Sequence, residues 1–346
     1  MYNILKFSVL SFFSLVLLLP FIGIFSKINL DIDAIINFFK NNYTYRLIYF
    51  SLFQAFLSAM ISCLIAIPFS LALNRRKNLK IVKIIISLCG FSFVIPSILI
   101  VYAVIKLFGS SGFLNLYFDI YKQFSIETIY GIKAILIAHI LLNTPFATRL
   151  FFHNLNSIPL KYYEISKSFS LPYLGNIIKL EIPFIKQNFF SIFAIIFTLC
   201  FLSFAIVMAL GGGPKYSTIE VAIYQYALFD LNFNKAILLS FIQIIICLFF
   251  LFIGFYKLKG TNYFEVEINT FIHPNKDLKF SIILDIFVIL VFSSFLFSPI
   301  IIIFSNLLNS GIFNIVFDIH FIDAFINSFI ISILTGIFVS FFGFIL

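Results

Sequence analysis

Few side chains in this sequence have the type and spacing that catalysis or metal binding requires. The sequence holds no G-x-x-x-x-G-K-[ST] loop for the phosphates of ATP, no G-x-S-x-G nucleophile turn and no H-E-x-x-H zinc motif. Its four cysteines form no C-x-x-C or Cys/His cluster, and each lies inside an apolar run, as small core residues do. We therefore predict no catalytic residue, no metal site and no cofactor.

Two ionisable residues lie within apolar runs, where such groups are candidates for a functional role. Asn143 follows His139 by one helical turn, and the simpler interpretation of this histidine is a hydrogen bond between helices. Asp285 lies a turn or two beyond Lys279, so we expect it to meet water or that lysine near the end of its apolar run. A proton-coupled transporter would be expected to carry more buried charge than this.

The most informative spacing lies in a polar, basic interruption, at about residues 152–187, between two apolar runs. An apolar stripe with helical spacing follows one face of it, formed by Tyr162, Ile165 and Phe169. Pro172 and Gly175 come next and favour a break between two short helices. Such a stripe is typical of a helix that binds in the groove of a partner protein. An ordinary amphipathic helix at the membrane surface has the same pattern.

Apolar runs long enough to cross a bilayer must position this segment. Hydrophobic residues make up 62% of the sequence and charged residues 11%, whereas a soluble domain carries about 25% charged residues. We predict an all-α fold, a polytopic bundle of transmembrane helices surrounded by lipid. The predicted spans are residues 7–25, 47–73, 84–108, 129–151, 189–210, 236–256, 280–304 and 324–346.

Basic residues predict how the bundle is oriented. A dense cluster lies between the second and third predicted spans, formed by Arg75, Arg76, Lys77, Lys80 and Lys83. Because Lys and Arg collect in cytoplasmic loops, this cluster and the interruption at residues 152–187 are predicted to be cytoplasmic, as is the N-terminus. The same rule accounts for the net charge of +9 without a nucleic-acid partner.

Segments near the two ends of the sequence resemble each other. The tripeptide KFS opens the first and the seventh predicted spans, and PFIGIFSK at Pro20 resembles PIIIIFSN at Pro299. Small residues of the second span recur at a constant offset in the eighth. We expect a six-helix module at residues 1–260, followed by the first two helices of a second module at residues 278–346. On this interpretation the chain is truncated and lacks the rest of its second module.

The polar interruption also resembles the signature loop of a known family. The spacing of Glu164, Ser170, Ile182 and Pro183 matches the loop E-A-A-x3-G-x9-I-x-L-P of the membrane subunits of binding-protein-dependent ABC importers. The two alanines and the glycine of that loop are replaced here by Ile165, Ser166 and Ser170. In the family, two short helices joined at the glycine dock in a groove of the ATPase subunit. The resemblance implies an ATPase-docking loop with Tyr162, Glu164, Ile165, Phe169, Ser170, Gly175 and Pro183.

A second resemblance lies at residues 200–236. The sequences LGGGP, from Leu210, and TIEVAIYQ, from Thr218, resemble the matching part of bacterial thiamine and thiamine pyrophosphate ABC transporter permeases, which fuse two six-helix modules. The resemblance covers about residues 40–260. It implies an external gate and substrate-side helix with Gly211, Gly212, Gly213, Pro214, Glu220, Tyr224 and Gln225. By themselves, the glycines and the proline indicate only the end of a helix, and Glu220 is equally consistent with a solvated acid or with attraction of a cationic substrate.

The resemblance therefore implies a type I ABC importer permease in a bacterial inner membrane, which carries thiamine or its phosphates inward. Its expected partners are separate ATPase subunits, a periplasmic substrate-binding protein, and a second permease half or a second copy of this chain. An iron(III) or other small-solute ABC permease is the alternative within the class. A secondary transporter is less favoured. A membrane enzyme is disfavoured, because the sequence shows no nucleophile, metal cluster or carboxylate pair.

Overall fold

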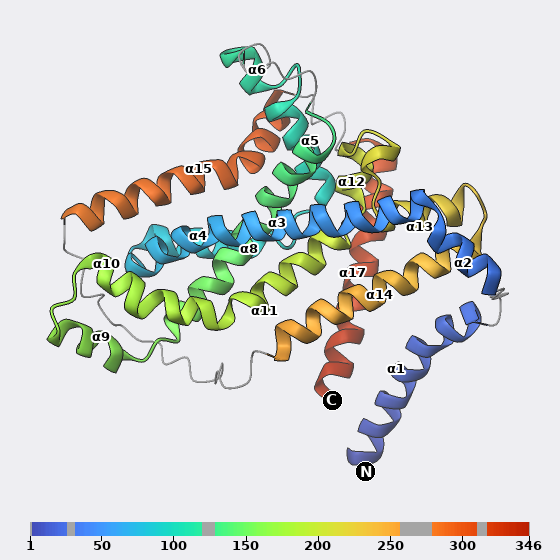
Figure 1. Ribbon diagram of the computed structural model, residues 1–346, viewed down its shortest axis with the longest axis horizontal. Coiled ribbons are helices and arrows are strands. Elements are labelled where there is room, and N and C mark those ends of the chain that lie inside the picture. Colours follow the sequence, from blue (N-terminus) through green and yellow to red (C-terminus); the bar gives the residue numbers. More distant parts are fainter. Residues whose placement is uncertain (1, 26–31, 120–128, 257–278, 310–316, 346) are drawn as a thin grey trace. The chain divides into compact units, whose positions relative to one another are not determined.

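The structure, a computed structural model, describes residues 2–25, 32–119, 129–256, 279–309 and 317–345 (Figure 1). Within those residues every regular element is helical, so the predicted all-α fold class is confirmed. The chain divides into two compact units, a larger one of Asn37–Ile303 and a smaller one that joins Met1–Ile36 to Phe304–Leu346. All the side chains that the sequence singles out for a functional role lie in the larger unit.

Most of the described chain is in helices joined by short connections. A π-helical segment, Ile177–Glu181, links two of them, and a 3-10 turn, Pro214–Tyr216, precedes another. The α-helices are α1 (Tyr2–Phe25), α2 (Ile32–Lys40), α3 (Asn42–Arg75), α4 (Lys80–Phe91), α5 (Ser97–Phe108), α6 (Phe113–Phe118), α8 (Ile132–Asn156), α9 (Leu160–Ser168), α10 (Tyr173–Asn176), α11 (Ile182–Phe201), α12 (Ala205–Leu210), α13 (Ile219–Leu228), α14 (Phe233–Tyr256), α15 (Lys279–Asn309) and α17 (Ile319–Ile345).

Several helical segments are long and apolar enough to cross a bilayer. In the described part of the chain they are Asn42–Arg75, Ser97–Phe118, Ile132–Asn156, Tyr173–Phe201, Phe233–Tyr256, Lys279–Ser305 and Ile319–Ile345. The first predicted span, residues 7–25, falls in α1, which carries a shorter apolar stretch, Lys6–Pro20. Lengths and composition therefore agree with a protein that crosses the membrane several times.

The core of the larger unit forms where α3 packs against α8 and α11. One fully buried face of α3 carries small side chains every three or four positions, namely Ala55, Ala59, Cys63 and Ala66. Small residues let helix backbones approach closely, which is the main source of helix association in lipid. The crossing of α11 and α14 is also close, because a Cβ on Gly254 would lie 2.8 Å from the Cβ of Ala194.

Two predicted spans are not continuous helices, and both predictions were wrong in this respect. Residues 84–108 form α4 and α5, with a non-helical connection at residues 92–96. Pro96, the N-cap of α5, favours this first break, because a proline disfavours helical backbone in the residue before it. Residues 189–210 are divided between α11 and α12 by residues 202–204. No proline marks this second break, and hydropathy alone could not reveal it.

The smaller unit is built from α1 and α17, where the rings of Phe12 and Phe13 contact Phe342. The predicted boundary between the two modules, at residues 260–278, lies outside the described residues. The same holds for most of the predicted cytoplasmic loop at residues 257–279. The division into a module at residues 1–260 and a second at residues 278–346 stays a prediction.

Candidate functional site

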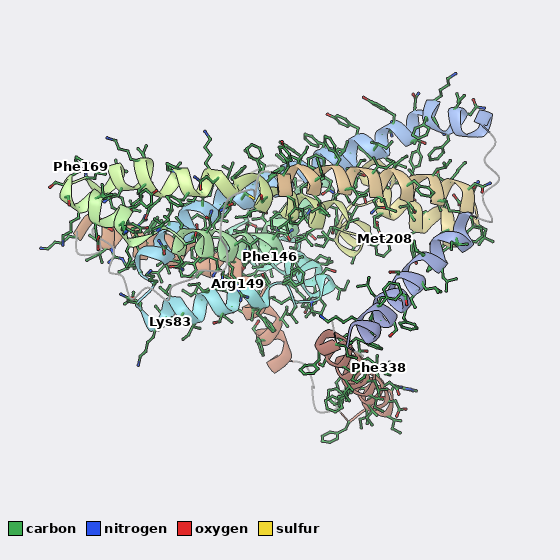
Figure 2. The ribbon with its side chains drawn as sticks, turned by 90° about the horizontal axis from the view of Figure 1, so that it is seen from below. Lys83, Phe146, Arg149, Phe169, Met208 and Phe338 are labelled. Carbon is green, nitrogen blue, oxygen red and sulfur yellow. The ribbon has the colours of Figure 1, made fainter. Side chains whose placement is uncertain are left out.

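The polar interruption folds as two short helices, α9 and α10, followed by the π-helical segment that enters α11. On α9, Tyr163 and Ser166 face the bundle and are buried. The predicted stripe faces outward, with Tyr162, Ile165 and Phe169 exposed to 49%, 53% and 75%. Figure 2 shows Phe169 at one end of the larger unit, with its ring directed away from the bundle. An exposed row of large apolar side chains is therefore carried on a helix that is anchored by its opposite face.

The break between the two short helices lies at Ser170. This residue has a φ of 48°, in the left-handed region that favours glycine. The Ser170 N–H donates to the Lys167 carbonyl at 3.0 Å, and the Leu171 N–H donates to the Ser166 carbonyl at 3.1 Å. These two bonds form a Schellman motif, which ends many helices with a left-handed residue. The position that the resemblance assigns to the loop glycine thus has the backbone conformation that glycine would favour.

The other predicted loop residues have different positions. Gly175 lies inside α10 rather than at the break, and a Cβ there would lie 3.0 Å from Cδ of Pro172. Glu164 is exposed on α9, and its carbonyl accepts a hydrogen bond from the Ser168 hydroxyl at 3.1 Å. Pro183 is the second residue of α11 and follows directly on the π-helical segment, so its missing N–H cannot continue the helical hydrogen bonds of that segment.

A buried cluster of charges joins this loop to two long helices, and sequence reasoning missed most of it. The Arg75 guanidinium of α3 lies 3.3 Å from the Glu181 carboxylate and 2.8 Å from that of Asp285 on α15. Arg76 donates from Nε to the other Asp285 oxygen at 2.9 Å, and the Ser281 hydroxyl also donates to that oxygen. Asp285 and Glu181 are fully buried, so each charge is neutralised by a partner rather than by water.

The expectation that Asp285 meets water or Lys279 was wrong. α15 places the carboxylate against the end of α3, where the two adjacent arginines hold it. The Arg75 guanidinium also lies 5.0 Å from the centre of the Tyr173 ring, a cation–π contact with α10. The sequence signal was the pair of arginines at the end of a span, together with a lone acid, Asp285, in an apolar run and Glu181 near the end of the polar interruption. Spacing along the chain could not pair residues so far apart.

Buried polar groups next to this cluster behave as expected for a site shielded from water. Burial raises the pKa of Tyr163 on α9, and the nearby Glu181 carboxylate raises it further. Burial lowers the pKa of Lys77, whose ammonium donates to Asn156 Oδ1 at 3.2 Å. The Ser166 hydroxyl of α9 donates to Asn176 Oδ1 of α10, which holds the two short helices together.

The glycine-rich segment forms a turn at the other end of the larger unit, between α12 and α13. Gly212 and Gly213 have φ of 73° and 122°, and side chains other than glycine rarely adopt such conformations. Gly211 closes α12, and Pro214 starts the short 3-10 turn. The Leu210 carbonyl accepts a hydrogen bond from the Gly131 N–H at 2.8 Å, which ties the turn to the start of α8.

The predicted substrate-side residues lie on α13. The Glu220 carboxylate is half-buried and accepts a hydrogen bond from the Gln243 side chain of α14. The Tyr224 ring packs on Phe204 with ring centres 4.8 Å apart. The Gln225 carbonyl accepts two backbone hydrogen bonds that close the end of the helix. Glu220 is therefore held by the bundle rather than standing free in solvent.

His139 bonds across helices, as predicted, and Asn143 does so as well. His139 Nδ1 is 3.0 Å from the Ser58 hydroxyl of α3, and Asn143 donates to Cys200 Sγ of α11 at 3.2 Å. All four cysteines are free and buried. Among the described residues, no group of three His, Cys, Asp or Glu side chains is placed to hold a metal ion.

The two candidate regions lie apart. α9 and α10 are at one end of the larger unit, whereas α12 and α13 lie toward the other (Figure 1). Figure 2 shows the same separation between Phe169 and Met208, a residue of α12, with Phe146 of α8 between them. The arrangement can receive a partner protein at the α9 end, and it carries a glycine turn at the far end.

The sequence of this chain is similar to those of known transport proteins, although no family model matches it. It is 35% identical over 274 residues to the thiamine transport system permease protein ThiP of Haemophilus influenzae, which covers 79% of this chain and 50% of that protein. The ThiP protein of Escherichia coli is 32% identical over 215 residues, or 60% of this chain and 39% of that protein. The chain thus spans about half the length, or less, of these curated relatives.

The fold is found among solved structures. A bacterial ABC transporter involved in the import of the acidic polysaccharide alginate matches with a TM-score of 0.59 and 16% identity, over 73% of this chain and 93% of that one. At this identity the match shows the fold alone. The resemblance inferred from the loop and the glycine turn is confirmed. The chain is a multi-pass membrane protein that has the fold of ABC importer membrane subunits and is similar in sequence to bacterial thiamine transport permeases.

Proposed function

We propose that this chain is the membrane permease subunit of an ABC importer that carries thiamine or its phosphates into a bacterial cell. The observation that carries the proposal is the outward apolar stripe of α9 on a loop that is fixed to the bundle by buried charges. The named relatives supply the substrate class. The chain itself performs no chemistry in this proposal, and separate ATPase subunits hydrolyse ATP.

Docking of an ATPase subunit uses the exposed face of α9. Tyr162, Ile165 and Phe169 present large apolar side chains at helical spacing, which a groove in the partner can bury. The Schellman turn at Ser170 fixes the direction in which the helix leaves the loop. Glu164, Gly175 and Pro183 shape the same loop without contributing to the stripe.

The buried charges would transmit the movement of the docked ATPase subunits. A shift of α9 passes through α10 and the π-helical segment to Glu181, which is ion-paired with Arg75 of α3. Arg75 is in turn paired with Asp285 of α15. Closing of the ATPase subunits would therefore move α3, α11 and α15 together and alternate the access of the pathway.

The α9 end faces the cytoplasm in this proposal, and so does the N-terminus, because the basic cluster from Arg75 to Lys83 lies at that end. A periplasmic substrate-binding protein would dock near Gly211–Pro214, where the glycines let the backbone change conformation. Glu220, Tyr224 and Gln225 line the substrate side of that entrance. The division into two permease modules remains part of the proposal.

The proposal can be tested in a host strain that lacks its own copy of the permease and carries this chain instead. Growth of the strain and its uptake of substrate are measured. We expect rescue on limiting thiamine but not on limiting iron, and uptake of labelled thiamine that requires the ATPase subunit. Rescue on iron alone would overturn the assignment of thiamine. Uptake that persists without an ATPase subunit would identify a secondary transporter instead.

A pair of matched variants tests the docking surface. Phe169→Ala combined with Ile165→Ala should abolish co-purification of the ATPase subunit, because the two most exposed anchors of the stripe are lost. Phe252→Ala on α14 removes a phenylalanine of similar exposure, 70%, and should leave co-purification intact. If both variants bind the ATPase subunit equally well, α9 is not the docking helix.

A further inference from the structure

An exposed arginine lies against α4 near one end of a candidate membrane span. Arg149 of α8 is exposed, and its guanidinium lies over Gly90, where an added Cβ would overlap Nη1 and lie 2.8 Å from Cζ. Arg149 is seven residues before Asn156, where the span ends, which is about 10 Å along the helix. The side chain therefore lies close to the depth at which hydrocarbon gives way to lipid headgroups.

The positive charge of Arg149 has no counter-charge in the described part of the chain. The ion pairs found there all belong to the buried charge cluster, and none involves Arg149. Neither α4 nor α8 contains an acidic residue. An arginine at membrane depth is costly unless it is paired or reaches the interface, so an anion beside it would stabilise this arrangement.

α4 adds a second basic side chain to the same surface. Lys83, Ser87 and Gly90 have helical spacing and form one stripe along α4, and the contact at Gly90 shows that this stripe faces Arg149. Lys83 and Ser87 are exposed, as is His153, one turn from Arg149 on α8. Figure 2 shows Lys83 and Arg149 near each other along α4. We call the side chains of Lys83, Ser87, Arg149 and His153 the basic edge.

The outward face of α4 beside the basic edge is apolar. Ile84, Leu88 and Phe91 are exposed to 54%, 38% and 53%. Beyond Arg149, Phe93 packs on Phe146 of α8 with ring centres 5.3 Å apart. Positive side chains thus come first along α4 and exposed hydrocarbon follows, the same order in which a phospholipid places its headgroup and its acyl chains. The surface suits an amphipathic anion better than a small soluble one.

We propose that the basic edge binds the phosphodiester headgroup of an anionic phospholipid, in the leaflet at the α9 end. Arg149 and Lys83 contact the phosphate oxygens, and the acyl chains lie along the apolar face of α4. This inference goes beyond the proposed function, because it concerns a lipid and does not depend on which solute the protein carries. A bound headgroup would hold α4 against α8 beside the end of α3.

Quenching of fluorescence by brominated lipids measures the binding. The chain contains no Trp, so Phe91→Trp adds a single one on the exposed face of α4. The purified full chain is placed in phosphatidylcholine nanodiscs with increasing fractions of a brominated lipid. Each basic side chain near a membrane attracts an anionic lipid by about 1 kcal/mol, or about five-fold. Brominated phosphatidylglycerol should therefore bind at least about five-fold more tightly than brominated phosphatidylcholine.

A tryptophan elsewhere on the bundle is the matched control. Ile245→Trp is at a position on α14 that is 65% exposed, and there the two lipids should quench equally within about two-fold. Equal affinity of the two lipids at Phe91→Trp would overturn the proposal. So would a preference of the same size at both positions, because it would reflect general attraction between the protein and anionic lipids.

Removing single charges tests the basic edge on the Phe91→Trp background. Arg149→Gln and Lys83→Gln should each lower the preference for phosphatidylglycerol at least about two-fold, and Arg149→Lys should retain most of it. Lys106→Gln removes an exposed positive charge from α5 and should leave the preference unchanged. An unchanged preference in Arg149→Gln and in Lys83→Gln would overturn the basic edge as the site. Should Arg149→Gln fail to fold, Lys83→Gln decides.

Gly90→Leu separates a defined site from general attraction between charges. Both basic side chains remain, but the new side chain would occupy the place where the Arg149 guanidinium lies. The preference for phosphatidylglycerol should fall about as far as in Arg149→Gln. A preference that survives in Gly90→Leu would show that charge alone matters, and it would overturn a site built around Gly90.

Two further measurements distinguish the lipid from other occupants. Soluble glycerol phosphate should not reverse the quenching, and reversal would assign the basic edge to a free phosphate instead. The four native cysteines are buried, so Lys83→Cys adds an exposed one, and a disulfide-linked dimer in membranes would show that a second copy of the chain covers this surface. Either result would overturn the lipid site. None of these measurements involves transport, so the site can fail while the proposed function stands.

Discussion

Different interactions stabilise the two ends of the larger unit. At the α9 end, Arg75 forms ion pairs with two fully buried carboxylates, those of Glu181 and Asp285. At the other end, the described residues of the glycine turn and of α13 form no ion pair, and hydrogen bonds hold them instead; in one of these the Ile219 N–H donates to the Ser51 hydroxyl at 2.8 Å.

This difference predicts that the two ends move in different ways. Buried ion pairs fix geometry strongly, because removing one partner leaves a charge without compensation in a medium of low polarity. Neutral hydrogen bonds and glycines allow the backbone to reach alternative conformations at small free-energy differences. We expect the α9 end to move as a rigid body and the glycine turn to change shape. The following predictions test that contrast.

The largest effect is expected for Asp285→Ala. The change removes the carboxylate that Arg75 and Arg76 both contact and leaves Arg75 paired with Glu181, and breaking a buried ion pair destabilises proteins by about 3–5 kcal/mol. Denaturation in detergent should show this loss. Asp230→Ala, which removes an exposed acid, is the control and should change stability by less than about 0.5 kcal/mol. Equal stabilities of the two variants would contradict a structural role for the charge cluster.

Glu181→Gln should separate docking from transmission. The amide keeps the volume of the side chain but removes the charge that faces Arg75, a change worth about 1.5–3 kcal/mol for a charged hydrogen bond. The exposed stripe of α9 is untouched, so the ATPase subunit should still co-purify. Substrate-stimulated ATP hydrolysis should fall. Unchanged stimulation would show that movement reaches the helices by another route.

Gly213→Ala should destabilise the glycine turn by about 1–3 kcal/mol, because a φ of 122° with a ψ of −170° is open essentially to glycine alone. No atom lies within 4 Å of the added Cβ, so the effect would report backbone strain without a clash. Thermal unfolding measures the loss of stability, and an uptake assay measures its effect on transport. Gly336→Ala inside α17 also meets nothing within 4 Å, and it should instead stabilise the protein slightly. A neutral Gly213→Ala would remove the contrast between the two ends.

The smallest effect is expected for Ser170→Gly, which should stabilise the protein rather than destabilise it. Ser170 adopts a left-handed conformation that disfavours side chains by about 1–2 kcal/mol relative to glycine. Part of this gain is lost to the greater freedom of glycine in the unfolded chain, so a net stabilisation of about 0.5–1 kcal/mol is expected. A shift of the unfolding midpoint to lower denaturant would contradict the Schellman assignment.

The sequence predicted local features of the loop well. The stripe of Tyr162, Ile165 and Phe169 and the change of direction near Pro172 both depend on neighbouring residues, and the structure has both. It could not reveal the pairing of Arg75 with Glu181 and Asp285, because that pairing depends on how distant helices pack. Prolines were a poor guide to helix breaks. Pro68 and Pro145 lie inside continuous helices, whereas the break after Phe201 has no proline.

The length of α3 has a consequence for the lipid around the protein. Its 34 residues extend about 51 Å, whereas the hydrocarbon core of a bilayer is about 30 Å thick. The helix must therefore tilt or project beyond the hydrocarbon at its ends, and each adjustment depends on bilayer thickness. Because α3 ends at Arg75, the depth of the charge cluster follows from how this mismatch is accommodated. The rate of uptake, measured after reconstitution in lipids of different acyl-chain length, should thus be highest at one bilayer thickness, which the length of α3 determines.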